Sequence, residues 1–100
     1  MLIAHVFFSV APEKRETALN TLIEEAPKVR AMAGCRTFVP FIDPIDPQKL
    51  GIIHEWENKD GFAAYIASSG FAKVGHVLRP MMTSAPVSKR FDADLLETVN

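Results

Sequence analysis

The chain has 100 residues, which is room for one small domain, and a domain of this size buries a smaller fraction of its surface than a larger one. Its 48% of hydrophobic and 23% of charged residues exclude a disordered or fibrous protein. Eleven basic and twelve acidic side chains nearly cancel, and no run of Lys or Arg is long enough to follow a phosphate backbone, so nucleic acid is not an expected partner.

The first predicted elements are a strand and a long helix. Residues 2–10 alternate with a period of two, and both faces are apolar. One face carries Leu2, Ala4, Val6, Phe8 and Val10, and the other carries Ile3, His5, Phe7 and Ser9. From Pro12 the apolar spacing becomes helical and continues to Val29. Gly34 offers a left-handed stop, and Pro27 predicts a kink near residues 23–27.

The middle of the chain predicts a β-hairpin. Residues 35–42 and 49–56 have the pattern of strands, and the loop between them is rich in proline and aspartate. Pro40 has no backbone N–H, so its strand is expected at an edge of the sheet or at a bulge. The side chains that share one face of the second strand are Leu50, Ile52, His54 and Trp56.

The last third of the chain predicts a second helix and a fourth strand. Asn58 is the expected helix cap, and one face of its helix carries Phe62, Tyr65, Ile66 and Ser69. Gly70 is expected to separate this helix from a shorter helical turn that Pro80 ends. A strand is expected at residues 87–91, with the tail at residues 92–100 as a candidate short helix.

The order strand, helix, strand, strand, helix, strand predicts the α+β class and a ferredoxin-like fold with an antiparallel sheet. Helices cover only one face of such a sheet, yet Ile3 and Phe7 make the other face apolar. A second copy of the same sheet is the simplest cover. We therefore expect a single domain over residues 1–100 that forms a homodimer.

A single cysteine and a short apolar N-terminal stretch set the expected surroundings. Cys35 excludes an intramolecular disulfide and a thiolate-rich metal site, and is expected to be a small core residue. Residues 2–10 are interrupted by His5 and Ser9 and lack a preceding basic region, so they fit neither a secretory signal nor a membrane span. We expect a cytoplasmic protein with no membrane partner.

Several short segments, in their order and spacing, resemble the antibiotic-biosynthesis-monooxygenase family. They are Ala26-Pro27-Lys28-Val29-Arg30, Gly34-Cys35, Asp43-Pro44, Glu55-Trp56-Glu57, Phe62, Ala67-Ser68 and Phe71. The resemblance extends over residues 3–91, and the segment from Gly34 to Pro40 is most similar to the quinol-monooxygenase branch. It implies a dimeric α+β barrel of two sheets packed face to face, with a pocket between sheet and helices in each subunit.

For the characterised enzymes, the resemblance implies oxidation of phenolic or quinol substrates by O2 without metal, haem or flavin. Other relatives degrade haem or rearrange a phosphorylated sugar, so the fold does not fix the reaction. Many relatives carry histidine where this chain has Tyr65 and Gly70. The haem-degrading relatives combine a first-strand Asn, a helix Trp and a His ligand. This chain has no such Asn and places His76 one position out of register, so haem degradation is not expected.

Oxidation of a quinol by O2 needs the electron-rich anion of the substrate, a base, donors for the oxyanion and a dry pocket. The candidate catalytic residues are His54, His76 and Tyr65, with either histidine as the base. The candidate substrate-binding residues are Trp56, Arg79, Phe62, Phe71 and His5. No metal or cofactor site is expected, since three histidines from distant segments do not make a metal site by themselves.

Each candidate residue also has a structural alternative. His54 and His5 fit core or interface histidines, Trp56 fits a core anchor, and His76 with Arg79 fits a solvated helix end. The expected function is a cofactor-independent monooxygenase for a small aromatic or quinol substrate, with O2 as co-substrate. Two alternatives remain open: a non-catalytic small-molecule-binding dimer and a cofactor-free isomerase of the same fold.

Overall fold

The computed structural model describes residues 1–100, and the elements follow the predicted order. The strands are β1 (Leu2–Ser9), β2 (Cys35–Ile42), β3 (Lys49–Trp56) and β4 (Val87–Asp92). The helices are α1 (Arg15–Arg30), α2 (Lys59–Ile66) and α3 (Ser69–Leu78), with 3-10 turns η1 (Pro12–Lys14) and η2 (Arg79–Met81). The predicted ferredoxin-like α+β fold is confirmed.

The four strands form one antiparallel sheet in the order β2-β3-β1-β4. Pro40 lies on the edge strand β2, as its missing N–H predicts, and the register shifts between Cys35 and Thr37. The register aligns one row of residues across all four strands on the helix-covered face. This row consists of Phe38, His54, Ala4 and Arg90.

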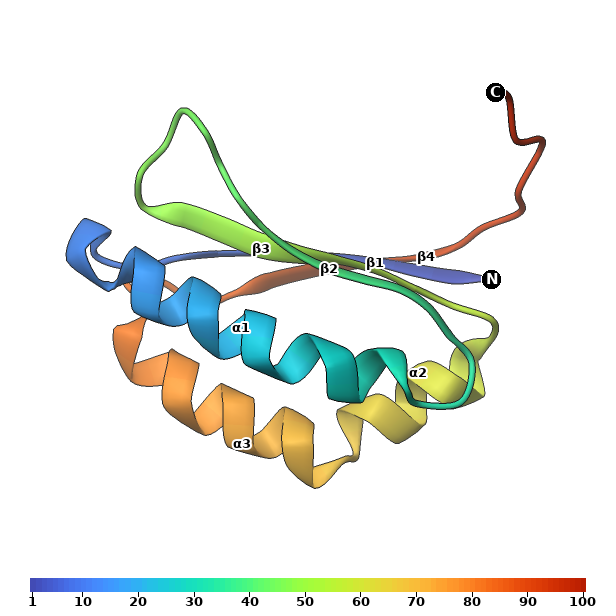
Figure 1. Cartoon of the computed structure of the whole chain (residues 1–100), viewed down its shortest axis with the longest axis horizontal. Helices are drawn as coiled ribbons and strands as arrows, with labels where there is room; N and C mark the ends of the chain where they lie inside the picture. Colours follow the sequence, from blue (N-terminus) through green and yellow to red (C-terminus); the bar gives the residue numbers. More distant parts are fainter.

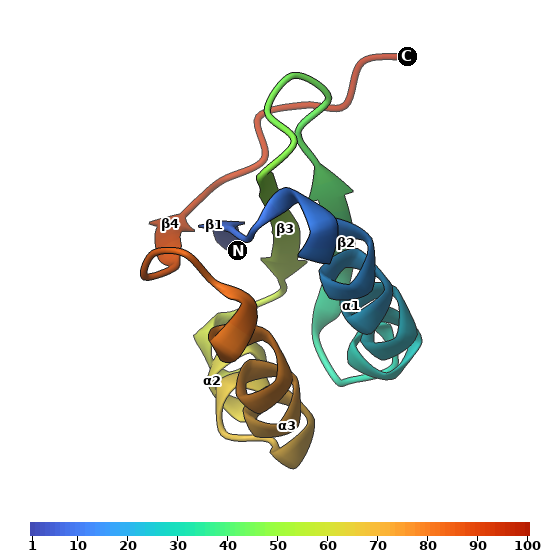
Figure 2. The same cartoon turned by 90° about the vertical axis from the view of Figure 1, so that its left-hand side faces the viewer.

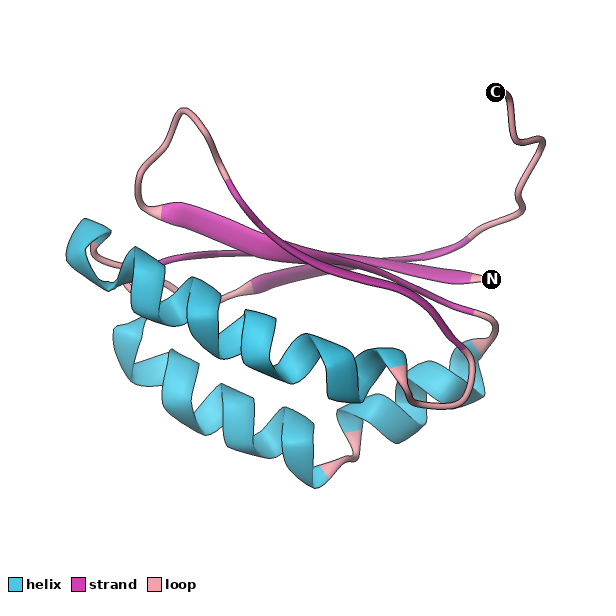
Figure 3. Ribbon diagram, viewed as in Figure 1, coloured by secondary structure: helices cyan, strands magenta, loops and turns pink.

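All the helices lie on one side of the sheet, so the structure has two layers (Figure 3). The long helix α1 lies beneath β2 and β3, whereas α2 and α3 lie beneath the half of the sheet that contains β4 (Figure 2). Helices α1 and α3 run side by side in the helical layer (Figure 1). None of these helices is long and apolar enough to cross a membrane.

The core between the two layers follows the apolar periodicity of the sequence. Ala4 and Phe8 of β1, and Val10 just after it, are buried in one core cluster with Leu22, Ala26 and Val29 of α1. Strand β3 buries Leu50, Ile52, His54 and Trp56, so the predicted common face is confirmed. Cys35 is partly buried and packs against this core, where burial raises the pKa of its thiol.

Two of the residues that were predicted to begin or end a helix have the expected geometry in the structure. The Asn58 side chain accepts hydrogen bonds from the backbone N–H groups of Asp60 and Gly61, both at 3.1 Å, which confirms the predicted cap. Gly34 has a φ of 82°, a conformation that side-chain-bearing residues rarely adopt. Helix α1 continues through Pro27 as far as Arg30.

Two predictions about the last third of the chain are wrong. The helix break lies at Ala67 and Ser68 rather than at Gly70, because the Ser68 hydroxyl accepts from the Phe71 N–H and caps α3. Ser69 therefore belongs to α3. The tail does not form a helix, since Asp92 ends β4 and residues 93–100 are irregular. Its apolar side chains find no packing partner that would stabilise so short a helix, and Leu96 is 95% exposed.

The face of the sheet away from the helices is largely apolar and is uncovered. It carries alternating side chains from all four strands, including Ile3, Phe7, Val39, Ile53, Val87 and Phe91. Phe7 is 37% exposed and Phe91 is 46% exposed. We call this surface the open face. His5 also lies on it, with its ring 5.4 Å from that of Phe91.

Candidate functional site

A hollow lies between the sheet and the second half of the helical layer. It consists of two adjoining lobes of about 120 Å³ and about 220 Å³ that share six lining residues. The shared residues are Val6, Ile52, Tyr65, Phe71, Arg79 and Pro86. The larger lobe is also lined by His54, Phe62, Ile66, Ser88 and Arg90. The smaller lobe is also lined by Phe8, Leu22, Val74, Gly75, Leu78 and Met82. We call this cavity the inner hollow.

The walls of the inner hollow are mostly apolar, and its size suits a small organic molecule. Apolar cavities of about 150 Å³ are large enough to hold benzene. The side chains of Val6 and Ile52 form the sheet side, and Phe62, Tyr65 and Phe71 form the helix side. Such a cavity with a few polar groups at one end has the usual composition of a ligand site.

His54 is the main polar group from the sheet. Its Nδ1 accepts a hydrogen bond of 2.8 Å from Nε1 of Trp56, which lies two residues away on the same face of β3. No buried side-chain nitrogen or oxygen lacks a hydrogen-bond partner. Since Nε2 of His54 makes no such bond, it is not sealed in the core and borders the inner hollow.

The surroundings of His54 keep its imidazole neutral. Burial lowers the pKa of His54 to about 4, and the positive charges of Arg90 and His5 act in the same direction. The hydrogen bond from Trp56 also occupies the Nδ1 lone pair that protonation would need. At neutral pH the ring therefore carries its proton on Nε2 and acts as a donor toward the inner hollow.

Two guanidinium groups border the inner hollow. Arg90 comes from β4, and its Cζ lies 4.9 Å from the centre of the Phe62 ring, within the range of a cation–π contact. Its Nε donates to the Ser88 hydroxyl at 3.3 Å. Arg79 follows α3 and borders both lobes. No Asp or Glu lines either lobe, so the charge of the cavity wall is positive.

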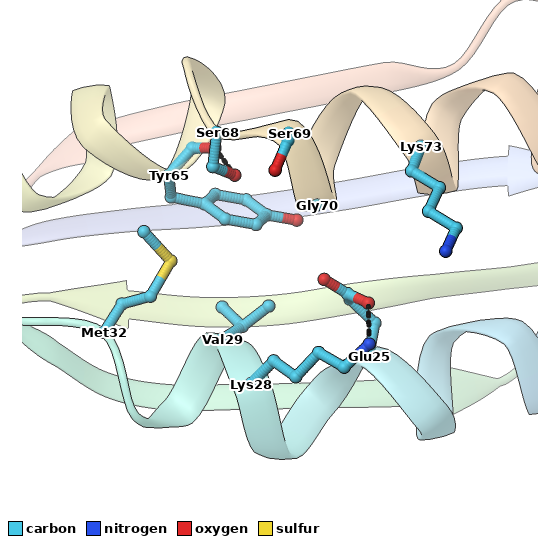
Figure 4. A pocket seen from close by; sticks show the side chains of 9 residues that line it. All are labelled: Glu25, Lys28, Val29, Met32, Tyr65, Ser68, Ser69, Gly70 and Lys73. Carbon is cyan, nitrogen blue, oxygen red and sulfur yellow. Dashed lines mark hydrogen bonds and ion pairs between the residues drawn. The ribbon is translucent and has the colours of Figure 1, made fainter.

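Tyr65 separates the inner hollow from a second depression on the outside of the helical layer. This outer groove of about 380 Å³ lies between α1 and the start of α3 and is lined by Glu25, Lys28, Val29, Met32, Tyr65, Ser68, Ser69, Gly70 and Lys73. Figure 4 shows the Tyr65 ring with its hydroxyl toward Gly70. Burial and the nearby Glu25 carboxylate raise the pKa of Tyr65 to about 12, so the phenol keeps its proton.

The outer groove is a less convincing site for chemistry than the inner hollow. Its charged side chains include Glu25 and Lys28, which form an ion pair at 3.7 Å on the same helix (Figure 4). A Cβ at Gly70 would lie 2.5 Å from the Glu25 carboxylate, which is the far end of a flexible side chain and can move aside.

The structure brings together five of the eight predicted site residues. They are His54, Tyr65, Phe62, Phe71 and Arg79, which all line the inner hollow. Trp56 is fully buried, stacks on Tyr65 at 5.5 Å and does not line the hollow. His76 is exposed on α3 and lines neither lobe. His5 lies on the open face, on the other side of the sheet.

Two further residues that line the inner hollow, Arg90 and Ser88, were not among the predicted site residues. Both lie on the helix-covered face of β4, where Arg90 pairs with Ala4 and Ser88 pairs with Val6. The signal was the alternation Val87, Lys89, Phe91, which leaves Ser88 and Arg90 for the other face. No group of three His, Cys, Asp or Glu side chains comes together as a metal-ligating cluster.

Comparisons with known proteins agree on the family and the fold. The profile of the antibiotic biosynthesis monooxygenase family matches residues 1–76. A structure from Deinococcus radiodurans, provisionally described as an antibiotic biosynthesis monooxygenase, superposes with a TM-score of 0.91 at 20% identity and covers 100% of this chain and 99% of its own. Similarity at this level of identity shows the fold alone.

Two further solved structures give the same picture. One from Caulobacter crescentus with the same provisional description has a TM-score of 0.88 at 19% identity, and the coverage is 94% of this chain and 90% of that one. A Bacteroides thetaiotaomicron protein of unknown function, provisionally described as an oxidoreductase, has a TM-score of 0.83 at 20% identity and coverages of 90% and 94%. No curated protein matches the sequence. The profile match over most of the chain shows that the protein belongs to the antibiotic biosynthesis monooxygenase family.

Proposed function

We propose that this protein is a monooxygenase that oxidises a small phenol or quinol with O2 and without a bound cofactor. The observation that carries the proposal is the inner hollow, which combines apolar walls with hydrogen-bond donors and guanidinium groups. A flat ring fits the walls, and the donors favour an oxygen that carries negative charge. Membership in the family supports the same class of reaction.

In this proposal the substrate reacts as its anion and needs no base from the protein. His54 is a neutral donor at neutral pH, and Tyr65 holds its own proton with a pKa of about 12. Arg79 and Arg90 favour the ionised form of a bound phenol and lower its pKa. His54 then donates from Nε2 to the phenolate oxygen. This role replaces the general base expected of His54 or His76.

The electrons for the reaction come from the substrate. For a phenol with a hydrogen on the ring carbon para to the hydroxyl, one phenol and one O2 give one quinone and one water. One oxygen atom forms the new ring carbonyl and the other leaves as water with the hydroxyl and ring hydrogens. The ring loses four electrons and O2 gains four.

A second candidate is a small-molecule-binding protein without catalysis. The observation that favours it is that neither His54 nor Tyr65 has a pKa near neutrality, so the inner hollow has no acid-base pair. The same observation argues against a cofactor-free isomerase, which needs a residue that takes a proton and one that returns it.

The test is oxygen uptake with a panel of hydroquinones and naphthalenols, followed by mass spectrometry of products formed under 18O2. We expect one labelled oxygen per product and no increase in dissolved oxygen on adding catalase. Arg90→Met should lower kcat/KM about tenfold or more, the effect of losing a hydrogen bond to a charged group. Lys73→Met, which removes a cation from the outer groove, is the matched control. Binding without uptake would favour the non-catalytic candidate, and uptake without label would indicate an oxidase.

We also propose that the protein is a homodimer joined through the open face. Phe7, Ile53 and Phe91 are each 37–46% exposed there, beside apolar neighbours on every strand. A contiguous apolar surface of this kind on a small protein usually marks an interface. A second copy of the sheet is complementary to it by symmetry and would bury both surfaces.

A further inference from the structure

The hydrogen bond between Trp56 and His54 fixes where the imidazole proton lies. An indole N–H is only a donor, so Nδ1 of His54, 2.8 Å away, must present its lone pair. The other tautomer would set two N–H groups against each other and leave a buried donor unpaired, at a substantial cost in free energy. The single remaining proton is therefore on Nε2, which borders the inner hollow.

Neighbouring rings hold both partners of this hydrogen bond in place. Trp56 is stacked on Tyr65 with ring planes 21° apart, and its side chain is fully buried. The His54 ring is 2% exposed and lies between Phe38, at 5.5 Å, and Phe62, at 5.6 Å. Neither ring can turn over without displacing the aromatic core, so the donor is preorganised.

The charged groups around this donor have one sign. From the elements that face His54, the inner hollow receives Arg79 after α3 and Arg90 on β4, while Tyr65 of α2 directs its hydroxyl toward Gly70. The residues from α1 and β1 that line the hollow are apolar. His5, also on β1, lies across the sheet on the open face. These donors and positive charges favour a ligand with an acceptor oxygen, above all an anionic one.

We propose that Trp56 is a positioning residue that locks His54 as an Nε2–H donor, and that this donor makes the inner hollow selective for flat apolar ligands bearing an anionic oxygen. The second part rests on the proposed function, since it names the ligand class of the same cavity. The first part stands independently. A buried donor discriminates strongly against analogues that lack the acceptor, because such analogues leave it unpaired.

The tautomer of His54 is tested by NMR of the side-chain nitrogens in 15N-labelled protein without any ligand. We expect long-range 1H–15N correlations to show His54 wholly as the Nε2–H tautomer from pH 6 to pH 8, with the exposed His76 as an internal reference. In Trp56→Phe the His54 signals should shift toward a mixture of tautomers. Leu50→Val is the matched control, because Leu50 is buried on the same face of β3, lines neither lobe of the inner hollow and takes no part in the hydrogen bond. An Nδ1–H tautomer in the wild type would overturn the positioning role of Trp56. This measurement uses the wild type alone, so it does not depend on whether a variant folds.

The ligand class is tested with 4-nitrophenol and its methyl ether, 4-nitroanisole. We expect bound 4-nitrophenol to absorb as the yellow phenolate at a pH where the free compound is mostly protonated. Its affinity should fall about tenfold in Trp56→Phe and should not fall in Leu50→Val, while 4-nitroanisole should bind weakly to all three proteins. Equal affinities for the two compounds, or no phenolate on binding, would overturn the ligand class even if the tautomer is as expected. Binding of phenolate without oxygen uptake by any substrate would overturn the proposed monooxygenase and leave this inference standing.

Discussion

Replacing His54 by Gln should remove a large part of the loss of stability between pH 7 and pH 4. The pKa of His54 is about 4 in the folded protein and 6.5 in the unfolded chain. Between these values the unfolded state binds a proton that the folded state does not, so the free energy of unfolding falls as the pH decreases. The stabilising contribution is complete above pH 6.5 and is lost progressively toward pH 4.

The size of this effect follows from the pKa difference. One pKa unit corresponds to about 1.4 kcal/mol. Because of His54, the free energy of unfolding should therefore fall by about 3 kcal/mol between pH 7 and pH 4. That is a large part of the stability of a small domain. The side chain is 2% exposed, so little of this term is screened by solvent. The glutamine amide is neutral throughout this range, and its oxygen can accept the Trp56 N–H in place of Nδ1.

Urea denaturation at pH 7, 6, 5 and 4 measures this contribution at one fixed protomer concentration, because a dimer gains stability with concentration. The free energy of unfolding should fall by about 3 kcal/mol more in the wild type than in His54→Gln over this range. His76→Gln is the matched control, since it removes an exposed histidine, and should follow the wild type. Parallel curves for wild type and His54→Gln would refute the buried neutral imidazole.

Three other substitutions test the fold and the proposed interface. Phe7→Glu puts a charge in the middle of the open face and should convert a dimer to monomers in sedimentation at micromolar protomer concentration; an unchanged mass would place the interface elsewhere. Asn58→Ala removes two hydrogen bonds at the N-terminus of α2 and should lower stability by about 1 kcal/mol in urea titrations. Gly34→Ala should lower the melting temperature through a cost of about 1–2 kcal/mol, since the nearest atoms are 3.8 Å from the new Cβ and only the φ of 82° opposes it; no change would show that the backbone relaxes there.

The strands and long helices could be predicted because each carries a repeated pattern that one physical cause explains. The stripe around Leu22 indicates a helix with one buried side, and the structure buries that side. The period of two around Phe8 indicates a strand, although both of its faces are apolar. The break between α2 and α3 was harder, because Ser68 and Gly70 are both plausible ends of a helix. Their spacing does not tell which one applies. The Ser68 hydroxyl accepts from the Phe71 N–H, and this contact decides the matter.

The candidate site was only partly predictable, because a cavity depends on where the layers leave space. Phe62 and Tyr65 were predicted on one helical face, and Phe71 was predicted on the following turn; all three line the inner hollow. Arg90 was missed because its place near the site depends on strand pairing, which the sequence does not show. It pairs with Ala4 on β1 and lies two strands from His54 on β3. The role of His54 was beyond sequence reasoning, since it depends on the orientation of two rings and the atom that Trp56 Nε1 reaches.

The pH dependence of the reaction distinguishes a substrate that enters as its anion from one that a residue deprotonates. Between pH 5 and pH 9 the imidazole of His54, with a pKa of about 4, stays neutral and the phenol of Tyr65, with a pKa of about 12, stays protonated. A rise of kcat/KM with pH must then reflect the substrate's own ionisation. Two substrates with different acidities should give inflections that differ by the difference between their free pKa values, each in the same direction. A common inflection for both substrates would instead reveal a base on the enzyme, and the proposed role of His54 as a donor would then be wrong.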